Sequence, residues 1–358
     1  MHDVIVVGGR VAGSALAIQL ARAGLDLVVV DRCRFPSDTL STHQMQVVGV
    51  SRLAELGVLD RVLAAGTPPT RRIRFHAAGS ILDAPVPRVD GQDFMLSPRR
   101  TVLDTALIDA ARDAGADVWE GVGVESLLRD GERVVGVRAR ARTDGQVVEE
   151  RARLVVGADG HRSTIARLVD ARPYDTRPAR TVASYTYWDG LTADGGEMYS
   201  GTGWAAGAWP TNDGLTLTYA ARPIGEWDEV RRNPERALLG VLARAGDLGA
   251  RARTATRIGP VRTTNDTGAA FHTASGSGWL LVGDAGLVLD PITGLGMTHA
   301  LEDATSAAAA VQRALDGSDV RALKGFGRQR YRRRKAIYEL TADLAQLRGT
   351  TPAEEPLF

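Results

Sequence analysis

The sequence has a single cysteine, only two lysines and no long apolar run in its 358 residues. One thiol, Cys33, cannot form a disulfide within the chain, which favours a reducing compartment. No apolar run reaches about 18 residues, so we expect no transmembrane helix. The formal net charge is +1, from 44 basic and 43 acidic residues, which gives no reason to expect a nucleic-acid partner. Because the first predicted strand begins near residue 3, we expect no signal peptide and a cytoplasmic protein.

The beginning of the chain has the pattern of a parallel βαβ unit. Asp3–Val7 is a short apolar run, which predicts a strand buried on both faces. Ser14–Ala23 predicts a buried helix, and Leu27–Val30 predicts a second buried strand that ends at Asp31. This order and length are typical of a nucleotide-binding fold.

The later segments predict a second sheet and terminal helices. Residues 133–142 and 147–154 alternate apolar and polar residues around a turn, which predicts a hairpin. Aromatic and β-branched residues are frequent in three segments, which predict antiparallel strands: 182–188, 203–210 and 215–221. A final helix is predicted over 319–347, with an apolar face formed by Ile337, Leu340, Leu344 and Leu347.

These patterns predict an α/β fold, in which a Rossmann-like nucleotide-binding domain carries an inserted antiparallel β-sheet domain and C-terminal helices. We expect the nucleotide-binding domain to be discontinuous and to comprise residues 1–70, 97–180 and 258–318. The substrate-binding sheet domain would take 71–96 and 181–257, and the C-terminal helical segment 319–358.

A glycine-rich turn joins the first predicted strand to the first predicted helix. It reads Gly8-Gly9-Arg10-Val11-Ala12-Gly13, and Asp31 follows the next strand. Glycines let the backbone approach a pyrophosphate at a helix N-terminus, where free amides favour anions. An acid about 20 residues further on can accept the hydroxyls of a ribose. Arg10 replaces the middle glycine of the usual pattern, and its side chain either points away or meets the pyrophosphate.

Two further turns combine glycine with an acid after a buried strand. Asp159-Gly160 follows the predicted strand 154–156, and Gly283-Asp284 follows 278–282. A Pro/Gly-rich loop, 290–296, then opens onto a helix whose first amides are free. Each turn alone could be an ordinary connection. The ends of parallel strands in an open sheet are, however, where ligands bind.

Together, these three sites resemble those of the FAD-dependent aromatic-hydroxylase superfamily, typified by para-hydroxybenzoate hydroxylase, over most of the chain. The resemblance implies FAD as the cofactor, with Gly8, Gly13 and Asp31 at its ADP half and Asp284 at its ribityl chain. It also implies that the helix after Gly294 directs its amides at the flavin. The residues predicted to contact FAD are Gly8, Arg10, Gly13, Asp31, Arg32, Arg100, Asp159, Gly283, Asp284, Pro291, Gly294, Leu295, Gly296 and Met297.

The late motif departs from that of many hydroxylases. Gly286 stands where they have histidine, and the Asp290-Pro291-x-Thr-Gly-x-Gly run is closer to the geranylgeranyl-reductase and halogenase branches. A halogenase of this superfamily depends on a tunnel lysine, whereas the only lysines here, Lys324 and Lys335, lie in the last predicted helix.

By this resemblance, the leading hypothesis is a monooxygenase that hydroxylates an aromatic or polyketide-like small molecule through a flavin C4a-hydroperoxide. O2 would be the co-substrate, with NADH or NADPH as a transient reductant or a partner flavin reductase supplying electrons, since no second dinucleotide motif is present. The alternatives are an FAD-dependent reductase of carbon–carbon double bonds and a non-catalytic protein like the Rab GDP-dissociation inhibitors.

Aromatic residues and one histidine are the candidates for substrate binding and catalysis. The aromatic residues are either pocket residues or simply good strand residues, and the candidates are Tyr185, Tyr187, Trp204, Trp209 and Tyr219. His43, in the polar loop after Asp31, is the catalytic candidate, with helix capping by neighbouring hydroxyls as the alternative for this loop. We expect no metal site.

Overall fold

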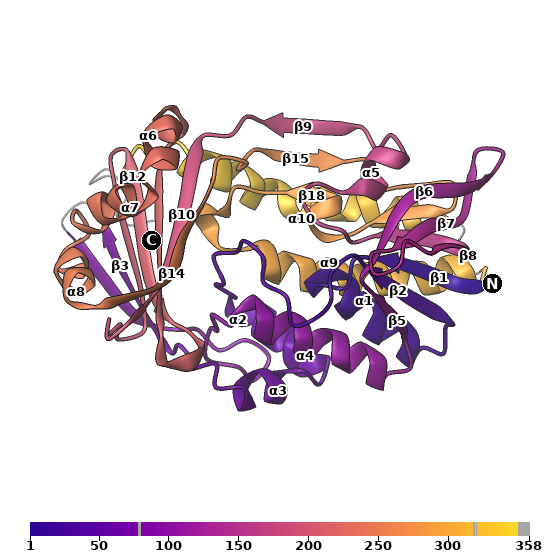
Figure 1. Cartoon of the computed structure of the whole chain (residues 1–358), viewed down its shortest axis with the longest axis horizontal. Coiled ribbons are helices and arrows are strands. Elements are labelled where there is room, and N and C mark those ends of the chain that lie inside the picture. The colour runs from indigo at the N-terminus through magenta and orange to yellow at the C-terminus, as the bar shows by residue number, and fades with distance from the viewer. Residues whose placement is uncertain (78–79, 318, 320, 350–358) are drawn as a thin grey trace.

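The computed structural model describes residues 1–77, 80–317, 319 and 321–349. Two large sheets lie at opposite ends of the molecule, with long helices beside them (Figure 1). Parts of the predicted segments 71–96, 258–318 and 319–358 fall outside the described residues. The division into domains stays a prediction, although the segments of each sheet can be followed in the structure.

The first sheet has eight strands and a parallel centre. Its order is β16-β17-β8-β1-β2-β5, and an antiparallel extension adds β7 to β8 and β6 to β7. The strands are β1 (His2–Val7), β2 (Leu27–Asp31), β5 (Asp117–Glu120), β6 (Val122–Asp130), β7 (Arg133–Ala141), β8 (Val147–Gly157), β16 (Ser275–Gly276) and β17 (Trp279–Leu281). The predicted hairpin of residues 133–154 is therefore confirmed.

Strand β1 lies between two parallel neighbours because both of its faces are apolar. Val6 pairs with Val29 of β2 and Val156 of β8. Val4 and Val6 belong to the core on one face of the sheet, whereas Ile5 belongs to the core on the other face. Burial on both sides explains the continuous apolar run in the sequence.

Helices cover one face of this sheet, and the β6–β7 extension covers the other with α5. The helices of the first half of the chain are α1 (Val11–Arg22), α2 (Val47–Glu55), α3 (Leu59–Ala64), α4 (Arg100–Asp113) and α5 (Thr164–Leu168). The long helix α9 (Gly296–Leu315) packs on α1. The βαβ unit and the helices near residues 101–114 and 297–315 thus form where the sequence predicted them.

The second sheet has seven strands in the order β14-β10-β13-β12-β11-β3-β4. All neighbours are antiparallel except β11 and β3, which pair in parallel. The strands are β3 (Arg72–Ala77), β4 (Ser80–Pro85), β10 (Thr181–Asp189), β11 (Gly196–Gly201), β12 (Trp204–Pro210), β13 (Thr216–Pro223) and β14 (Thr256–Thr264). Three helices without a sequence prediction accompany it: α6 (Trp227–Arg232), α7 (Pro234–Leu242) and α8 (Leu248–Thr254).

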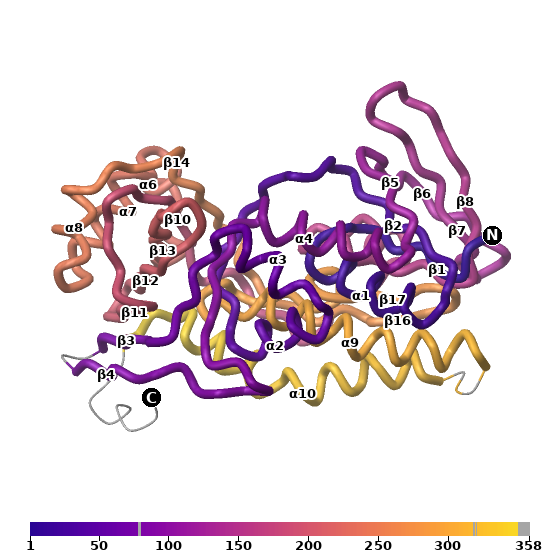
Figure 2. Tube along the Cα trace, turned by 90° about the horizontal axis from the view of Figure 1, so that it is seen from below, coloured from indigo at the N-terminus to yellow at the C-terminus, as the bar shows by residue number. Residues whose placement is uncertain are grey.

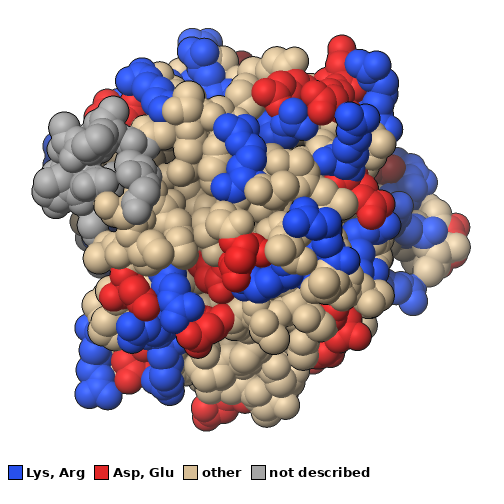
Figure 3. All heavy atoms as spheres, turned by 90° about the vertical axis from the view of Figure 1, so that its left-hand side faces the viewer, with Lys and Arg blue, Asp and Glu red and all other residues tan. Residues whose placement is uncertain are grey.

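The two faces of the second sheet have different surroundings. Helices α7 and α8 pack on the face that carries Trp188 and Tyr199. The opposite face carries Tyr185, Tyr187 and Tyr219 and is turned toward the parallel sheet. The period-two alternation of strands places these residues on two faces. At this end of the molecule, acidic and basic side chains are interspersed on the surface (Figure 3).

The last described helix, α10 (Ala322–Leu344), runs beside α9 toward the second sheet (Figure 2). Of the four residues predicted for its apolar face, Leu340 is exposed, Ile337 and Leu344 are half-buried, and only Leu347, just after the helix, is buried. The inward face carries Phe326, Arg330 and Tyr338 instead. A small third sheet, β18-β15-β9, lies nearby and is formed by β9 (Pro173–Arg177), β15 (Ala269–His272) and β18 (Leu287–Val288). Among the described residues, no helix is both long and apolar enough to cross a membrane.

Candidate cofactor and substrate site

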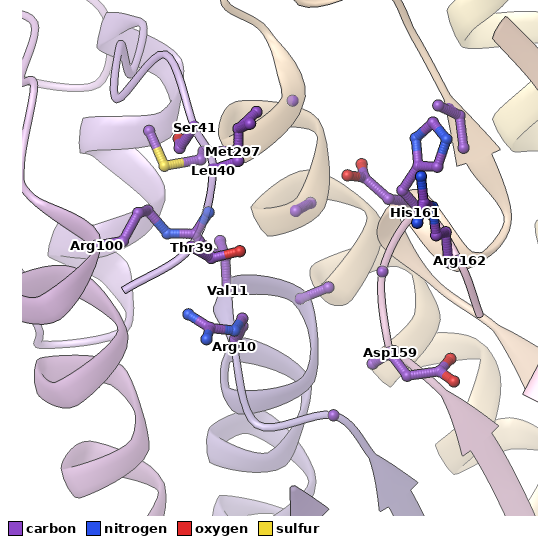
Figure 4. A pocket seen from close by; sticks show the side chains of 18 of the residues that line it. Arg10, Val11, Thr39, Leu40, Ser41, Arg100, Asp159, His161, Arg162 and Met297 are labelled. Carbon is purple, nitrogen blue, oxygen red and sulfur yellow. The ribbon is translucent and has the colours of Figure 1, made fainter. Parts of the chain in front are cut away.

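A cavity of about 640 Å³ lies where the parallel strands end and the second sheet begins. Its wall contains the turn after β1, the end of β2, the turn after β8, the start of α9 and part of the second sheet. Figure 4 shows Arg10 and Arg100 on one side of it, with Asp159 and His161 on the other. Segments far apart in the sequence therefore meet around a single space.

The turn between β1 and α1 requires glycine at two positions. Gly8 has φ +105°, and a Cβ atom there would lie 2.4 Å from the carbonyl oxygen of Ala158. A Cβ atom at Gly13 would lie 1.8 Å from the carbonyl oxygen of Gly8. The start of α1 has no side-chain cap, and Val11 and Ala12 line the cavity. Its free amides are therefore available to an anion.

Asp31 lies buried at the end of β2 and lines the cavity. Its Oδ2 accepts a hydrogen bond from the Gly9 amide at 2.7 Å, and its Oδ1 accepts one from the Cys33 amide at 2.7 Å. These bonds fix the carboxylate in place. Each oxygen keeps a further lone pair, so Asp31 can still accept hydrogen bonds from two ribose hydroxyls.

Arg10 does not point away from the fold. Its Nη1 donates to Asp104 Oδ2 at 2.5 Å, and its Nη2 donates to Ser37 Oγ at 2.7 Å. Arg100 donates to the other oxygen of Asp104 through Nε and Nη2, at 3.1 and 3.0 Å. Two guanidinium groups thus share one fully buried carboxylate, and both arginines line the cavity. The cluster leaves one net positive charge beside the glycine turn.

Asp159 caps a helix as well as lining the cavity. It accepts hydrogen bonds from Ser163 Oγ at 2.5 Å and from the Thr164 amide at 2.6 Å, at the start of α5. Burial raises the pKa of Asp159. These hydrogen bonds hold the turn after β8 in place, and this turn lies against Gly8. Neighbouring Gly160, also in the wall, leaves space where a Cβ atom would project.

Asp284 lines the cavity at the turn after β17. Burial raises its pKa, yet the residue keeps accessible surface on the cavity side. None of the described residues forms a hydrogen bond or an ion pair with it. Such a group requires water or a ligand as its partner.

The turn around Asp284 is supported by α10. Arg330 donates from Nη1 to the carbonyl of Leu281 and from Nη2 to that of Gly286, each at 3.0 Å, and its Nη1 lies 3.4 Å from Asp303. A Cβ atom at Gly286 would lie 2.4 Å from Arg330 Nη1. Glycine at this position therefore makes room for a buried guanidinium.

The loop before α9 forms another wall of the cavity. Asp290 accepts hydrogen bonds from Thr181 Oγ1 at 2.7 Å and from the Ile292 amide at 2.9 Å, and burial raises its pKa to about 6. Helix α9 starts at Gly296 without a side-chain cap, and a Cβ atom there would meet no protein atom within 4 Å. Pro291, Gly294, Gly296 and Met297 line the cavity. The free amides of α9 therefore face an open space.

His43 lies behind this wall, between Thr42 and Gln44, which line the cavity. Its Nδ1–H donates to the carbonyl of Ser41 at 2.7 Å, and its Nε2 accepts a hydrogen bond from the Tyr187 hydroxyl at 2.7 Å. Burial lowers the pKa of His43 to about 3, so the ring is neutral. The catalytic role assigned to His43 stays a prediction, and the structure gives the ring two protein partners.

The predicted substrate residues divide into three groups. Tyr185 and Tyr219 line the cavity. Tyr187 and Trp209 lie on the same face but outside the wall, and Trp209 Nε1 donates to the carbonyl of Thr42 at 3.2 Å. Trp204 lies on the opposite face, beside α7 and α8 and under the Arg244 guanidinium. Trp204 and Trp209 lie five positions apart in β12, so their side chains point to opposite faces of the sheet. This difference could have been predicted from the sequence.

Several wall residues were not singled out from the sequence. Asp104, which lies behind the wall and binds Arg10 and Arg100, was missed because nothing distinguishes a buried acid within a predicted helix from a solvated one. His161 Nε2 lies 3.0 Å from Asp266 Oδ1, and both residues line the cavity. His299, on the first turn of α9, is buried with an unpartnered Nδ1, and burial lowers its pKa to about 3. The described residues contain no cluster suited to a metal ion.

Comparison with known proteins shows the family. A model described as an FAD binding domain matches residues 1–190, more than half of the 358-residue chain. The chain therefore belongs to the FAD-binding domain family, with a fold shared by FAD-dependent monooxygenases, halogenases and reductases.

Three similar proteins have three different activities. The chain is 29% identical over 332 residues to a menaquinone reductase from Mycolicibacterium smegmatis, covering 86% of this chain and 75% of that protein. It is 32% identical over 168 residues to a rifampicin monooxygenase from Rhodococcus hoagii, covering 47% and 33%. The structure of a myxobacterial chondrochloren halogenase superposes with a TM-score of 0.88 at 25% identity, covering 99% and 87%. The family is thus one of FAD-dependent oxidoreductases, and these matches do not select one reaction.

The cavity fits FAD on observations of this structure. Two uncapped helix starts, those of α1 and α9, face it and provide free amides for anionic or electron-rich groups. Asp31 keeps acceptor capacity, and Asp284 has no partner within the part of the chain that the structure describes. The space beside Gly296 is one that a Cβ atom would fill.

Proposed function

We propose that this chain is an FAD-dependent monooxygenase that hydroxylates an aromatic or polyketide-like small molecule. The observation that carries the proposal is a continuous cavity. It extends from the glycine turn after β1, past Asp284, to the sheet face that carries Tyr185 and Tyr219. A cofactor held at the strand ends and a substrate held against the sheet would then share one space.

In this proposal, the ADP half of FAD lies between Asp31 and the start of α1, beside the positive cluster of Arg10, Arg100 and Asp104. The remaining predicted contacts are made by Arg32, Gly8 and Gly13 in the same region and by Asp159, Gly283, Pro291, Gly294, Leu295 and Met297 further along. Asp284 accepts hydrogen bonds from the ribityl hydroxyls. When bound, FAD supplies two-electron redox chemistry and the reaction with O2.

The protein's own contribution is electrostatic and steric. The amides at the start of α9 stabilise negative charge that develops on the edge of the ring system they face. The apolar sheet face excludes water and holds the substrate near the reacting atoms. Electrons would come from NADH or NADPH, directly or through a partner flavin reductase, in the cytoplasm.

A reductase of carbon–carbon double bonds is the second candidate. It is favoured by the similarity to a menaquinone reductase over 86% of this chain and by the Asp290–Gly296 loop. A halogenase has less support. Both lysines lie in α10, outside the cavity wall, and Lys335 is paired with Asp175 at 2.5 Å.

The decisive experiment compares aerobic and anaerobic turnover of the FAD-loaded protein. With NADPH or NADH, ¹⁸O2 and a panel of phenols and naphthols, a monooxygenase incorporates one ¹⁸O atom into the product. Anaerobic consumption of an alkene or quinone, with no ¹⁸O in any product, would instead support the reductase. A protein that retains no FAD under any condition would contradict both proposals and favour a non-catalytic protein like the GDP-dissociation inhibitors.

A further inference from the structure

One polar side chain in the cavity wall has no partner in the described part of the protein. Gln44, in the loop before α2, is 5% exposed and lines the cavity. Its carboxamide forms no hydrogen bond with any described residue, and neither polar atom of the amide is fully enclosed by protein. Because the residue is otherwise buried, the open side of its amide faces the cavity. A group so placed requires a partner there.

The protein makes room for this amide with a glycine. Gly294, in the loop before α9, has φ +63°, and a Cβ atom there would lie 2.6 Å from Gln44 Oε1. Any other residue at position 294 would therefore displace the amide, besides straining the backbone. Gly294 itself lines the cavity. The Gln44 amide thus lies at the cavity wall and is held there by the shape of the α9 loop.

Neighbouring polar groups of the same loop are satisfied within the protein. Both ring nitrogens of His43 have partners, and Ser41 Oγ accepts a hydrogen bond from the His43 amide at 3.1 Å. The backbone amide of Gln46 donates to Thr298 Oγ1 at 3.2 Å, which ties the loop to the first turn of α9. Gln44 differs from these neighbours, although holding a long polar side chain in a wall costs rotamer freedom. This contrast indicates a role in ligand binding.

The amide borders the same part of the cavity as the start of α9. Gly294 lies two residues before Gly296, where α9 begins without a side-chain cap. In the proposed function, the free amides of α9 face the edge of the flavin ring system. Gln44 therefore lies at the ring end of the cofactor site, and Asp31 and Arg10 lie at its ADP end.

We propose that the Gln44 carboxamide pairs with the pyrimidine edge of the flavin, accepting a hydrogen bond from N3–H and donating one to a neighbouring carbonyl oxygen. A carboxamide has an acceptor and a donor side by side, which match an N–H next to a C=O. The same complementarity lets glutamine bind the adjacent donor and acceptor of adenine. Gln44 thereby fixes the ring and selects an unsubstituted N3. This inference rests on the proposed placement of FAD and not on hydroxylation.

The test compares FAD with 3-methyl-FAD, in which a methyl group replaces the N3 hydrogen. The full-length apoprotein is titrated with each flavin, and binding is followed by flavin absorbance and fluorescence, without turnover. We expect the wild type to bind FAD about tenfold more tightly than 3-methyl-FAD, because a site built to pair with an N–H rejects an analogue that lacks it.

Substitution of Gln44 should remove most of this preference. Gln44→Met keeps the side-chain length and removes both polar atoms, so FAD binding should weaken about fivefold while 3-methyl-FAD binding stays nearly unchanged. Gln46→Met is the matched control, since it changes the same residue type in the same loop at a side chain outside the cavity wall. It should leave the ratio of the two Kd values unchanged. Apoprotein stability should be equal in Gln44→Met and wild type, because the lost amide has no partner among the described residues.

A second measurement is the midpoint potential of the bound flavin. A hydrogen bond donated to a flavin carbonyl stabilises the negative charge of the reduced ring. Gln44→Met should therefore have a lower potential than the wild type, and Gln46→Met should have the wild-type value. An anaerobic redox titration of the FAD-loaded proteins measures this difference.

Three results would overturn the inference: a wild-type ratio of Kd values in Gln44→Met, an equal fall of that ratio in Gln46→Met, or a midpoint potential that does not fall in Gln44→Met. The first would assign the amide to a substrate or to water, and the second would assign the preference to the shape of the loop. Failure of the proposed function is separate. A protein that shows the Gln44-dependent preference but incorporates no ¹⁸O keeps Gln44 as a flavin-binding residue and loses the assignment as a monooxygenase.

Discussion

Arg10 Nη1 lies 2.5 Å from Asp104 Oδ2, so the residue that replaces a glycine in the nucleotide-binding turn is anchored to helix α4. Arg100 binds the other oxygen of the same carboxylate. Arg10 also donates to Ser37 Oγ, which ties the loop after β2 to this cluster. The side chain thus positions the loop beside the cavity and adds positive charge to it.

The first prediction concerns this anchor. Arg10→Met removes the guanidinium and keeps the chain length, so the loop at Ser37 loses its tie and the cavity loses a positive charge. A hydrogen bond to a charged group contributes roughly 1.5–3 kcal/mol. We expect FAD to bind about tenfold more weakly, equivalent to about 1.4 kcal/mol, when the apoprotein is titrated with FAD. Arg61→Met, which breaks an exposed ion pair with Asp113, is the control and should leave the Kd unchanged.

The second prediction separates ligand binding from folding. Gly296→Ala places a methyl group where no protein atom lies within 4 Å. Stability of the apoprotein should stay within about 0.5 kcal/mol of the wild type. FAD affinity should fall, because the methyl group enters the space beside the first amides of α9. Equal FAD affinity in variant and wild type, measured by fluorescence titration, would show that the cofactor lies elsewhere.

The third prediction concerns the packing of Gly286 against Arg330 and again replaces a glycine by alanine. Gly286→Ala would put a Cβ atom 2.4 Å from Arg330 Nη1 and displace a buried guanidinium. We expect a loss of about 1–3 kcal/mol in the free energy of unfolding, measured in urea. Arg330→Met should cost about 3–5 kcal/mol, because Asp303 would remain buried without its partner. A Gly286→Ala protein as stable as Gly296→Ala would contradict this packing.

The fourth prediction is a pH dependence from His43. The pKa of this residue is about 3 in the folded protein and about 6.5 in an unfolded chain. The unfolded state therefore takes up a proton first as the pH falls below 6.5, and stability is lost from there toward pH 3. At pH 5 the loss relative to pH 8 is about 2 kcal/mol.

His43→Gln should lack this part of the pH dependence. Buried His299 also has a lowered pKa, but it is present in both proteins. Its contribution to the pH dependence of stability therefore cancels when the two proteins are compared over the same pH range. Parallel stability curves for wild type and variant between pH 8 and pH 5 would show that His43 is not held neutral by the fold.

The sequence was informative where backbone geometry leaves few choices. Gly8 and Gly13 have no room for a side chain, and Asp31 and Asp284 follow buried strands whose ends meet at one edge of a sheet. Such positions are visible as glycine and acid at fixed distances from apolar runs. The convergence of Gly8, Asp31 and Asp284 on one cavity could therefore be predicted.

The sequence was less informative where tertiary contacts override local pattern. Residues 328–335 form a basic stretch, a pattern typical of a solvated helix face. Arg330 in this stretch is nevertheless buried, and it donates to the carbonyls of Leu281 and Gly286. Leu340 reads as a core residue and is exposed. Trp204 was grouped with Trp209 by residue type, although the alternation of side chains along a strand places them on opposite faces of the sheet. Helices α7 and α8 are short, so each offers only two or three turns in which a period can be recognised.

The guanidinium of Arg330 reaches the Asp284 turn from a helix that contributes nothing to the cavity wall. The turn around Asp284, which would bind the cofactor, is therefore supported on the side away from the cavity by α10, a distant part of the chain. Shortening the protein within α10, or cleaving it there with a protease, would remove no residue of the cavity wall from the chain. The turn around Asp284 would nevertheless lose its support from Arg330. In this protein, a boundary drawn around the cofactor-binding motifs alone would not enclose a unit able to bind the cofactor.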